Sequence, residues 1–219
     1  MKIGIIDSGI NYEMISSDAH VTGFSLIRSE NGSIVFSDDY KDCNGHGNEC
    51  YKIISKQNRT ANFFIIKVFS ENLNTDDEIL AEAIQQCVLA RVDIINISAG
   101  VISDVISDHL REAIELALRN DTIIVAAMDN GGRTSFPASY DGVIGVGYTE
   151  LEIGESYRVI NFEKEYFFTN AKDQYPPDTS WAKSSSFACA KMTMYIAKLM
   201  NSTKHLSSRS LKRILIEST

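Results

Sequence analysis

Short apolar runs bounded by polar or Gly-rich turns recur along the chain, and each has the length of a buried strand. These strands are predicted at residues 2–6, 63–68, 93–97, 122–127 and 143–146. Other segments carry apolar residues at helical spacing, which predicts helices. The helices are predicted at residues 76–91, 105–119, 186–200 and 206–216. This alternation is typical of an α/β fold in which a predominantly parallel central sheet carries helices on both faces.

The rest of the chain adds little to this plan. Residues 150–175 are predicted to be irregular or to form a hairpin, and Pro176-Pro177 marks the end of that region. No internal repeat, low-complexity tract or linker interrupts the sequence. With 219 residues and a hydrophobic content of 44% the chain can bury a full core, so we predict one domain over residues 1–219.

Charge and composition exclude several classes of protein. The formal net charge of −8 argues against nucleic-acid binding, which needs clustered Lys and Arg, and favours basic or neutral partners. No apolar run approaches the roughly 18 residues of a membrane span, so no membrane segment is expected. Four cysteines are too few for a disulfide framework, which predicts reduced thiols. The segment after Met1 lacks the features of a secretion signal, so the sequence is that of a cytoplasmic protein or of a mature fragment. The initiator Met favours a cytoplasmic protein, and no prodomain is expected.

Three residues with catalytic chemistry lie far apart along the chain, each in a distinctive setting. Asp7 ends the first predicted strand, His46 lies between two glycines, and Ser186 opens a predicted helix. Taken singly, each is common as a turn or helix-capping residue. Their order of Asp, His and Ser is that of subtilisin, however, and differs from the order in chymotrypsin and in the α/β-hydrolases. The pattern favours a serine enzyme that cleaves peptide bonds.

Six segments resemble motifs of the subtilisin-like serine proteases, the subtilases. Those around the three residues above read IIDSG, NGHG and SSSFA, at residues 5–9, 44–47 and 184–188. Three more resemble the family's substrate-binding strand, its oxyanion-hole strand and the segment that follows, at residues 95–100, 125–130 and 135–140. The six occur in the family's order over nearly the whole chain. The resemblance implies a subtilisin-like fold and a peptidase activity.

The resemblance also implies a role for each residue. Ser186 is the nucleophile, His46 is its general base, and Asp7 orients His46 and stabilises the cationic form of the imidazole. The side-chain amide of Asn130 and the backbone N–H of Ser186 form the oxyanion hole. An extended peptide pairs with a strand of the protein, and a pocket takes the side chain before the scissile bond. The residues implied in substrate binding are Ser98, Ala99, Gly100, Ala127, Met128 and Asp129.

Several positions depart from the family's pattern without replacing a catalytic group. Asn48 stands where Thr is usual, Ala190 where Pro is usual, and Ser184 and Asp129 where Gly is usual. Loss of a Gly at Ser184 predicts a shifted backbone near the nucleophile and a lower catalytic efficiency. A carboxylate at Asp129 leads to the hypothesis that the enzyme cleaves after Arg or Lys, with a solvent-facing side chain as the alternative.

No metal ion or other cofactor is expected. Cys43 and Cys50 flank His46, but no second pair with short zinc-ligand spacing exists. The acidic residues around Asp42 do not form a loop dense enough in oxygen ligands for calcium. Cys189, close to Ser186, is predicted to be a small core residue.

Three functions remain open. The compact chain is similar to subtilases that remove leader peptides from modified peptides, which implies a narrow-specificity processing protease acting on a peptide or protein substrate. A general intracellular protease and a catalytically silent, peptide-binding subtilase fold are the alternatives, although the complete set of catalytic residue types argues against the silent fold. An α/β-hydrolase and a nucleotide-binding protein are discounted, because the sequence has no Gly-x-Ser-x-Gly elbow and no phosphate-binding Gly-rich motif. The sequence does not indicate an oligomeric state.

Overall fold

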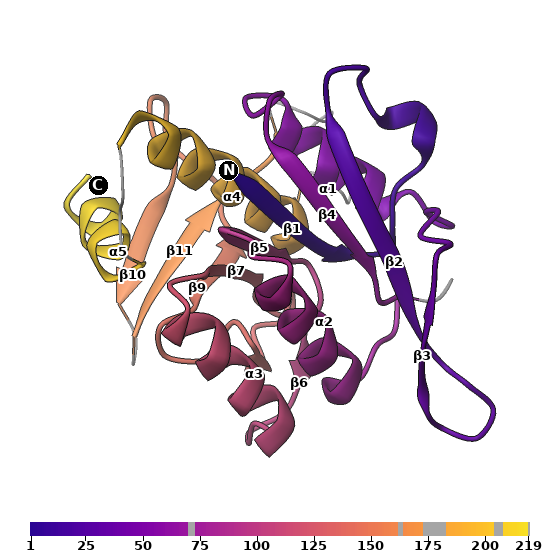
Figure 1. The fold of residues 1–219 in the computed structure, drawn as a ribbon. Coiled ribbons are helices and arrows are strands. Elements are labelled where there is room, and N and C mark those ends of the chain that lie inside the picture. Colours follow the sequence, from indigo (N-terminus) through magenta and orange to yellow (C-terminus); the bar gives the residue numbers. More distant parts are fainter. Residues whose placement is uncertain (70–72, 162–163, 173–182, 204–207, 219) are drawn as a thin grey trace.

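A nine-stranded sheet forms the centre of the computed structural model, which describes residues 1–69, 73–161, 164–172, 183–203 and 208–218 (Figure 1). The strand order is β10-β11-β9-β7-β5-β1-β4-β2-β3. The strands are β1 (Lys2–Asp7), β2 (His20–Arg28), β3 (Ile34–Ser37), β4 (Asn62–Lys67), β5 (Ile94–Ile97), β7 (Ile123–Ala127), β9 (Ile144–Tyr148), β10 (Arg158–Asn161) and β11 (Glu165–Thr169). A small second sheet pairs β6 (Val101–Ile102) with β8 (Ser135–Phe136).

Parallel pairing dominates the large sheet. The strands from β2 to β11 across its middle are parallel, while β3 and β10 add an antiparallel pair at each edge. Every residue of β5 and β7 is buried, because helices cover both faces at the centre. This double burial explains why β7 is an uninterrupted apolar run in the sequence and why β5 is apolar except at Asn96. It also leaves the carboxyl ends of the strands as the place for polar chemistry.

Helices pack on both faces of the sheet (Figure 1). One face carries α2 (Asp77–Leu89) and α3 (Asp108–Arg119), and the other carries α1 (His46–Ser55), α4 (Ser185–Ser202) and α5 (Ser208–Glu217). Side chains of β1 alternate between the two cores, with Ile5 on the side of α4 and Ile6 on the side of α2. The 3-10 turn η1 (Tyr12–Met14) follows β1.

The predicted α/β fold with helices on both faces is confirmed, and every predicted strand and helix exists. The largest error in a boundary concerns α3, which begins at Asp108 and not at 105. The hydroxyl of Ser107 accepts a hydrogen bond from the Leu110 N–H at 3.4 Å, and this cap sets the start of the helix. Helix α4 begins at Ser185, one position before the predicted start, with Ser184 as its N-cap.

Two hairpins lie at the edges of the large sheet, one unpredicted and one predicted as an alternative. The hairpin of β2 and β3 was not predicted, since its exposed positions interrupt the apolar pattern that marks the central strands. Residues 150–175 were predicted to be irregular or to form a hairpin, and the structure contains a hairpin there, formed by β10 and β11. Pro176-Pro177 lies outside the described residues.

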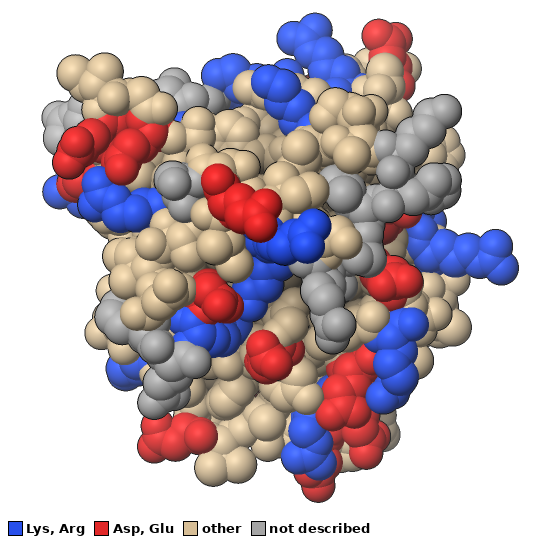
Figure 2. Space-filling model, turned by 90° about the vertical axis from the view of Figure 1, so that its left-hand side faces the viewer, with Lys and Arg blue, Asp and Glu red and all other residues tan. Residues whose placement is uncertain are grey.

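The surface carries both signs of charge. Figure 2 shows basic and acidic side chains next to one another on the side that includes α5 and β10. Ion pairs of this kind join Arg158 to Glu155 at 2.8 Å and Lys212 to Glu165 at 2.9 Å. In the described part of the chain, we find no helix with the length and apolar character that crossing a membrane requires.

Candidate active site

The polar residues singled out in the sequence meet at the carboxyl ends of the central strands. Asp7 is the last residue of β1, Ser98 follows β5 directly, and Asn130 comes shortly after β7. His46 and Ser186 lie in the first turns of α1 and α4, which pack against each other. A cavity of about 620 Å³ is lined by His46, Ser98, Asn130 and Ser186, so residues that are distant in sequence share one cleft.

Asp7 and His46 form a short polar contact at the wall of this cleft. His46 Nδ1 lies 2.7 Å from Asp7 Oδ1, and the Ser8 N–H donates to the same oxygen at 2.7 Å. Asp7 is fully buried, whereas the His46 ring borders the cleft. An ionised Asp7 assigns the proton to Nδ1, which leaves the lone pair of Nε2 available as a base.

The environment shifts the pKa of both partners. Burial disfavours the charged form of Asp7, but His46, helped by the Ser8 N–H and the Cys50 thiol, outweighs it and holds the pKa of Asp7 below its ordinary value. Burial also lowers the pKa of His46, but Asp7 and, more weakly, Asp42 outweigh it and raise that pKa. Asp7 therefore stays ionised over the range in which His46 titrates.

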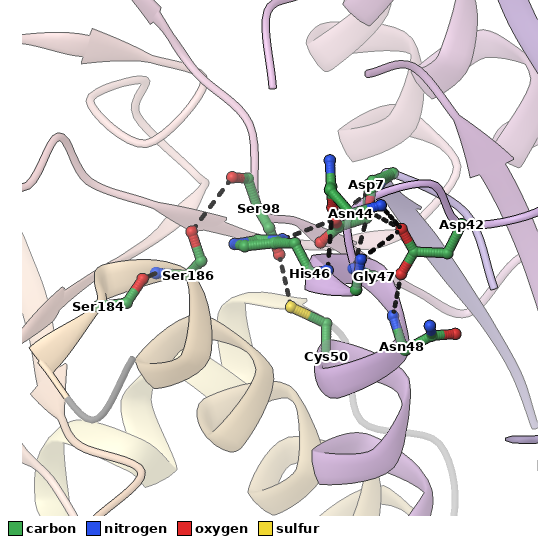
Figure 3. Close-up of polar contacts among 12 residues, drawn as sticks. Asp7, Asp42, Asn44, His46, Gly47, Asn48, Cys50, Ser98, Ser184 and Ser186 are labelled. Atoms are coloured by element: carbon green, nitrogen blue, oxygen red, sulfur yellow. Dashed lines mark hydrogen bonds and ion pairs between the residues drawn. The ribbon is translucent and has the colours of Figure 1, made fainter. Parts of the chain in front are cut away.

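A loop anchored by Asp42 positions His46 (Figure 3). The Asp42 carboxylate accepts the Ser8 hydroxyl at 2.9 Å and also accepts three backbone N–H groups at the start of α1. Ser8 Oγ in turn accepts the Gly47 N–H at 2.8 Å. A Cβ on Gly47 would lie 2.1 Å from the carbonyl oxygen of Gly9, so the end of β1 and the start of α1 approach more closely than any larger residue allows. Ser8 and Asp42 are structural residues of the site that the sequence analysis missed.

The hydroxyl of Ser186 has its hydrogen-bond partner in the residue that follows β5. Ser186 Oγ donates to the backbone carbonyl of Ser98 at 3.4 Å (Figure 3). Among the described contacts there is no hydrogen bond between Ser186 and His46. The next residue, Phe187, packs its ring 5.0 Å from the His46 ring, centroid to centroid. The structure thus brings Ser186 into the same cleft as the Asp7–His46 pair, with its hydroxyl turned to β5.

Asn130 is oriented by the start of α4. Its Oδ1 accepts the Ser185 N–H at 2.9 Å. Because the two heavy atoms of a carboxamide lie on opposite sides of the group, this contact leaves the NH₂ end for the cleft that Asn130 lines. An amide donor is therefore available beside Ser186.

A second, smaller cavity contains the residues that the resemblance assigned to substrate binding. It measures about 130 Å³ and lies next to Ser186 and Asn130. Its other lining residues are Ser98, Ala99, Gly100, Ile102, Ala127, Met128, Asp129 and Ser135. Ile102 and Ser135 were not predicted, because they enter through the small β6–β8 sheet that forms only in the folded chain.

Asp129 already has a basic partner within the protein. Arg133 binds both of its carboxylate oxygens, Nε to Oδ2 and Nη2 to Oδ1, each at 3.0 Å. The Gly131 N–H adds a contact to Oδ2 at 3.0 Å, and the hydrogen bond from Arg133 is the main cause of the lowered pKa of Asp129. This arrangement differs from both alternatives of the sequence analysis: the carboxylate is neither unpaired in the pocket nor simply solvent-facing. It argues against Asp129 as the binding partner of a basic substrate side chain.

A network of buried polar groups lies under the cleft. Asn96 donates to Ser98 Oγ at 3.0 Å and accepts the Thr193 hydroxyl at 2.9 Å. The thiols of Cys50 and Cys189 complete it, with sulfur 3.4 Å from Ser98 Oγ and from Asn96 Oδ1, respectively. These contacts join β5, α1 and α4 beneath the residues that line the cleft. The predicted core position of Cys189 is confirmed by its complete burial.

A comparison with models of protein families shows which family the chain belongs to. A model of the subtilase family matches residues 1–219. The chain belongs to this family. The minor extracellular protease Epr of Bacillus subtilis (strain 168) is 30% identical to this subtilase over 161 aligned positions, and the match covers 68% of this chain and 23% of that protein. The major intracellular serine protease of the same strain is 30% identical over 164 aligned positions, and the match covers 67% of this chain and 50% of that protein. The chain thus spans half or less of these two relatives.

Solved structures show the same fold. Prenylagaramide maturation protease PagA superposes on this subtilase with a TM-score of 0.70 at 21% identity, covering 92% of this chain and 75% of that chain. Nisin leader peptidase NisP from Lactococcus lactis superposes with a TM-score of 0.71 at 22% identity, covering 97% and 81%. A cold-adapted subtilisin-like serine proteinase gives a TM-score of 0.70 at 17% identity, covering 99% of this chain and 81% of that chain. At these identities the similarity establishes the subtilisin-like fold.

The geometry of this subtilase does not favour a metal ion in the cleft. Ligand atoms of Asp7, His46 and Cys50 lie within 4.8 Å of one another. However, the 2.7 Å between His46 Nδ1 and Asp7 Oδ1 is a hydrogen-bond distance, whereas two ligands of a tetrahedral zinc ion lie about 3.3 Å apart. Burial and the nearby Asp7 also raise the pKa of the Cys50 thiol, which opposes the thiolate that zinc binding needs.

Proposed function

We propose that this subtilase is a serine endopeptidase in which Ser186 is the nucleophile, His46 the general base and Asp7 the residue that orients His46. The observation that carries the proposal is the 2.7 Å contact between buried Asp7 and His46, whose ring borders a cleft that Ser186 and Asn130 also line. The peptidase domain is proposed to extend over residues 1–219, the range of the family match.

The proposed reaction has two halves. When a substrate fills the cleft, the Ser186 hydroxyl leaves the Ser98 carbonyl and transfers its proton to His46 Nε2 as Oγ attacks the peptide carbonyl carbon. The oxyanion that forms accepts hydrogen bonds from the Asn130 amide and the Ser186 N–H. His46 then donates the proton to the leaving amine, and the acyl group stays on Ser186. In the second half, His46 removes a proton from water as the water oxygen attacks the acyl carbon. His46 then returns the proton to Ser186 Oγ, and the acid product leaves.

The substrate is proposed to be a peptide or protein with an extended segment at the cleavage site. Ser98, Ala99 and Gly100 would pair with that segment as a strand, since they line both cavities and follow β5 at its carboxyl end. The small cavity walled by Ala127 and Met128 suits a small or medium uncharged side chain before the scissile bond.

We propose that the enzyme has a processing function with narrow specificity. Two structures of the same fold belong to a maturation protease and a leader peptidase, which supports the removal of a leader or propeptide. A cytoplasmic location is proposed with it, supported by the relative that is named an intracellular serine protease. Incubation with a random peptide library, followed by mass spectrometry of the products, tests the specificity. A strong preference at two or more positions is expected, and indiscriminate cleavage would favour the general intracellular protease.

The rate of peptide cleavage is expected to depend on the ionisation of His46. The neutral imidazole is the active form, and Asp7 and Asp42 raise its pKa above the ordinary value of 6.5. We therefore expect kcat/KM to rise with pH to a plateau, with a midpoint above 6.5, while Asp7 remains ionised throughout. His109→Ala, in the exposed start of α3, should leave that midpoint unchanged. A midpoint below 6.5 in the parent enzyme would contradict the assignment.

The Asp129–Arg133 pair leads to a prediction of how fast the enzyme cleaves after a basic residue. The parent should cleave after Arg or Lys no faster than after Ala or Leu, because Arg133 neutralises Asp129. Arg133→Ala would release the carboxylate and raise relative cleavage after Arg about fivefold to tenfold, measured with four peptides that differ at this position. Arg119→Ala, which breaks the ion pair with Glu115 on α3, serves as the matched control. An unchanged preference in Arg133→Ala would show that Asp129 does not face the substrate.

A further inference from the structure

The backbone N–H of Ser186 has a partner within the protein. Ser184 Oγ accepts it at 3.2 Å (Figure 3). Ser184 is the N-cap of α4 and Ser186 is the second residue of the helix, so this is a standard capping bond from the cap side chain to an N–H that the helix leaves unpaired. The family's usual Gly at this position would have no hydroxyl to make it.

This capping bond lies in the proposed active site. Ser184 lines the 620 Å³ cavity together with Ser186 and Asn130. Its backbone is extended, with φ −92° and ψ 131°, torsions that any residue adopts, so the shifted backbone predicted from the loss of Gly is not required. Ser184 therefore affects the proposed active site through its hydroxyl and not through its backbone.

We propose that the Ser184 hydroxyl occupies the oxyanion hole of the free enzyme and must leave the Ser186 N–H before a substrate carbonyl can bind there. This inference rests on the proposed peptidase function. An amide has one proton, and a good hydrogen bond to Ser184 Oγ uses it. The oxyanion needs that same proton. The Asn130 amide is not masked in this way, because its oxygen, and not its nitrogen, contacts α4.

The masked donor lowers the reactivity of the free enzyme. A substrate must supply enough binding energy along the cleft to displace the Ser184 hydroxyl, so a peptide with few contacts reacts slowly. A longer peptide, paired along Ser98 to Gly100, has more contacts with which to offset this displacement. Ser184 is therefore a positioning residue that acts through the Ser186 N–H and does not take part in proton transfer.

Ser184→Ala tests this directly. We expect kcat/KM for a short peptide amide to rise about twofold to tenfold, the range that corresponds to one neutral hydrogen bond. A peptide aldehyde, which forms an oxyanion when it adds to Ser186, should bind tighter by the same factor. The corresponding peptide alcohol, which forms no oxyanion, should bind equally well to both proteins. Ser184→Thr keeps the hydroxyl and should behave like the parent.

Ser107 offers a matched control, because its hydroxyl caps α3 away from the cleft. Ser107→Ala and Ser184→Ala should each lower Tm by about 2–4 °C through loss of a cap, but Ser107→Ala should leave the kinetics unchanged. Should Ser184→Ala fold poorly, Ser184→Gly replaces it, since Gly caps helices nearly as well without a hydroxyl.

The outcomes separate this inference from the proposed function. A parent enzyme that cleaves peptides and binds the aldehyde, combined with an unchanged or slower Ser184→Ala, would overturn the masking role of Ser184 alone. A slower variant would indicate that the hydroxyl donates to the oxyanion. A parent that neither cleaves peptides nor binds the aldehyde would overturn the proposed peptidase, and this inference with it.

Discussion

Ser186→Ala or His46→Ala should each lower kcat for peptide cleavage by about 10⁶-fold, and Asp7→Asn by about 10⁴-fold. Without Ser186 there is no acyl acceptor, and without His46 nothing removes its proton. Asp7→Asn would keep the shape of the side chain but lose the negative charge that fixes the proton on Nδ1, 2.7 Å away. The measurement is steady-state cleavage of a fluorogenic peptide, with circular dichroism to show that each variant is folded.

The combination of the variants makes this prediction sharper. Because Ser186 and His46 act as one unit, the double variant should be no slower than either single variant. Ser202→Ala, at the far end of α4, should retain full activity. Losses that add in the double variant, or a Ser186→Ala protein with more than a few per cent of the parent activity, would show that the two residues do not share a reaction step.

Asn130→Ala is the second large effect, with an expected loss of about 10² to 10³ in kcat and little change in KM. The amide acts on charge that develops after substrate binding, so the loss belongs to the chemical step. Asn130→Asp isolates the donor, because its oxygen can still accept the Ser185 N–H but it has no N–H to offer the oxyanion. Asn130→Asp should lose at least as much activity as Asn130→Ala.

Asn201→Ala, on an exposed position of α4, is the control for that pair. It should match the parent in kcat and in KM. A loss confined to KM in Asn130→Ala would mean that Asn130 binds the ground state of the substrate. Full activity in Asn130→Asp would contradict its role as a hydrogen-bond donor.

The central sheet was predictable because burial on both faces leaves a simple signature. The strand β7 is apolar at every position and β5 at every position except Asn96, and a helix separates the two strands along the chain. The hairpin of β2 and β3 was missed because the edge strand β3 meets solvent on both of its sides, as the exposure of the consecutive residues Val35 and Phe36 shows. Asn31-Gly32 in its turn was a local signal for a hairpin that could have been used.

The site could be predicted only where local sequence marks its residues. Asp7 and His46 are marked by their neighbours, and the structure shows that Gly47 is needed for the close approach of β1 to α1. The anchoring role of Asp42 was not predictable, because its partner Ser8 is 34 positions away. Arg133 was within reach, since it follows Asp129 by four residues around a Gly-rich turn. The predicted role of Asp129 omitted that local partner.

The most direct test of the proposed peptidase is its reaction with a fluorophosphonate, which modifies an activated serine covalently. We predict one adduct per molecule, located on Ser186 by mass spectrometry of proteolytic fragments, with a labelling rate that rises with pH as His46 loses its proton. His46→Ala should abolish the labelling. A folded parent protein that remains unlabelled, or that is labelled on a different serine, would contradict the proposed mechanism and favour a catalytically silent peptide-binding subtilase.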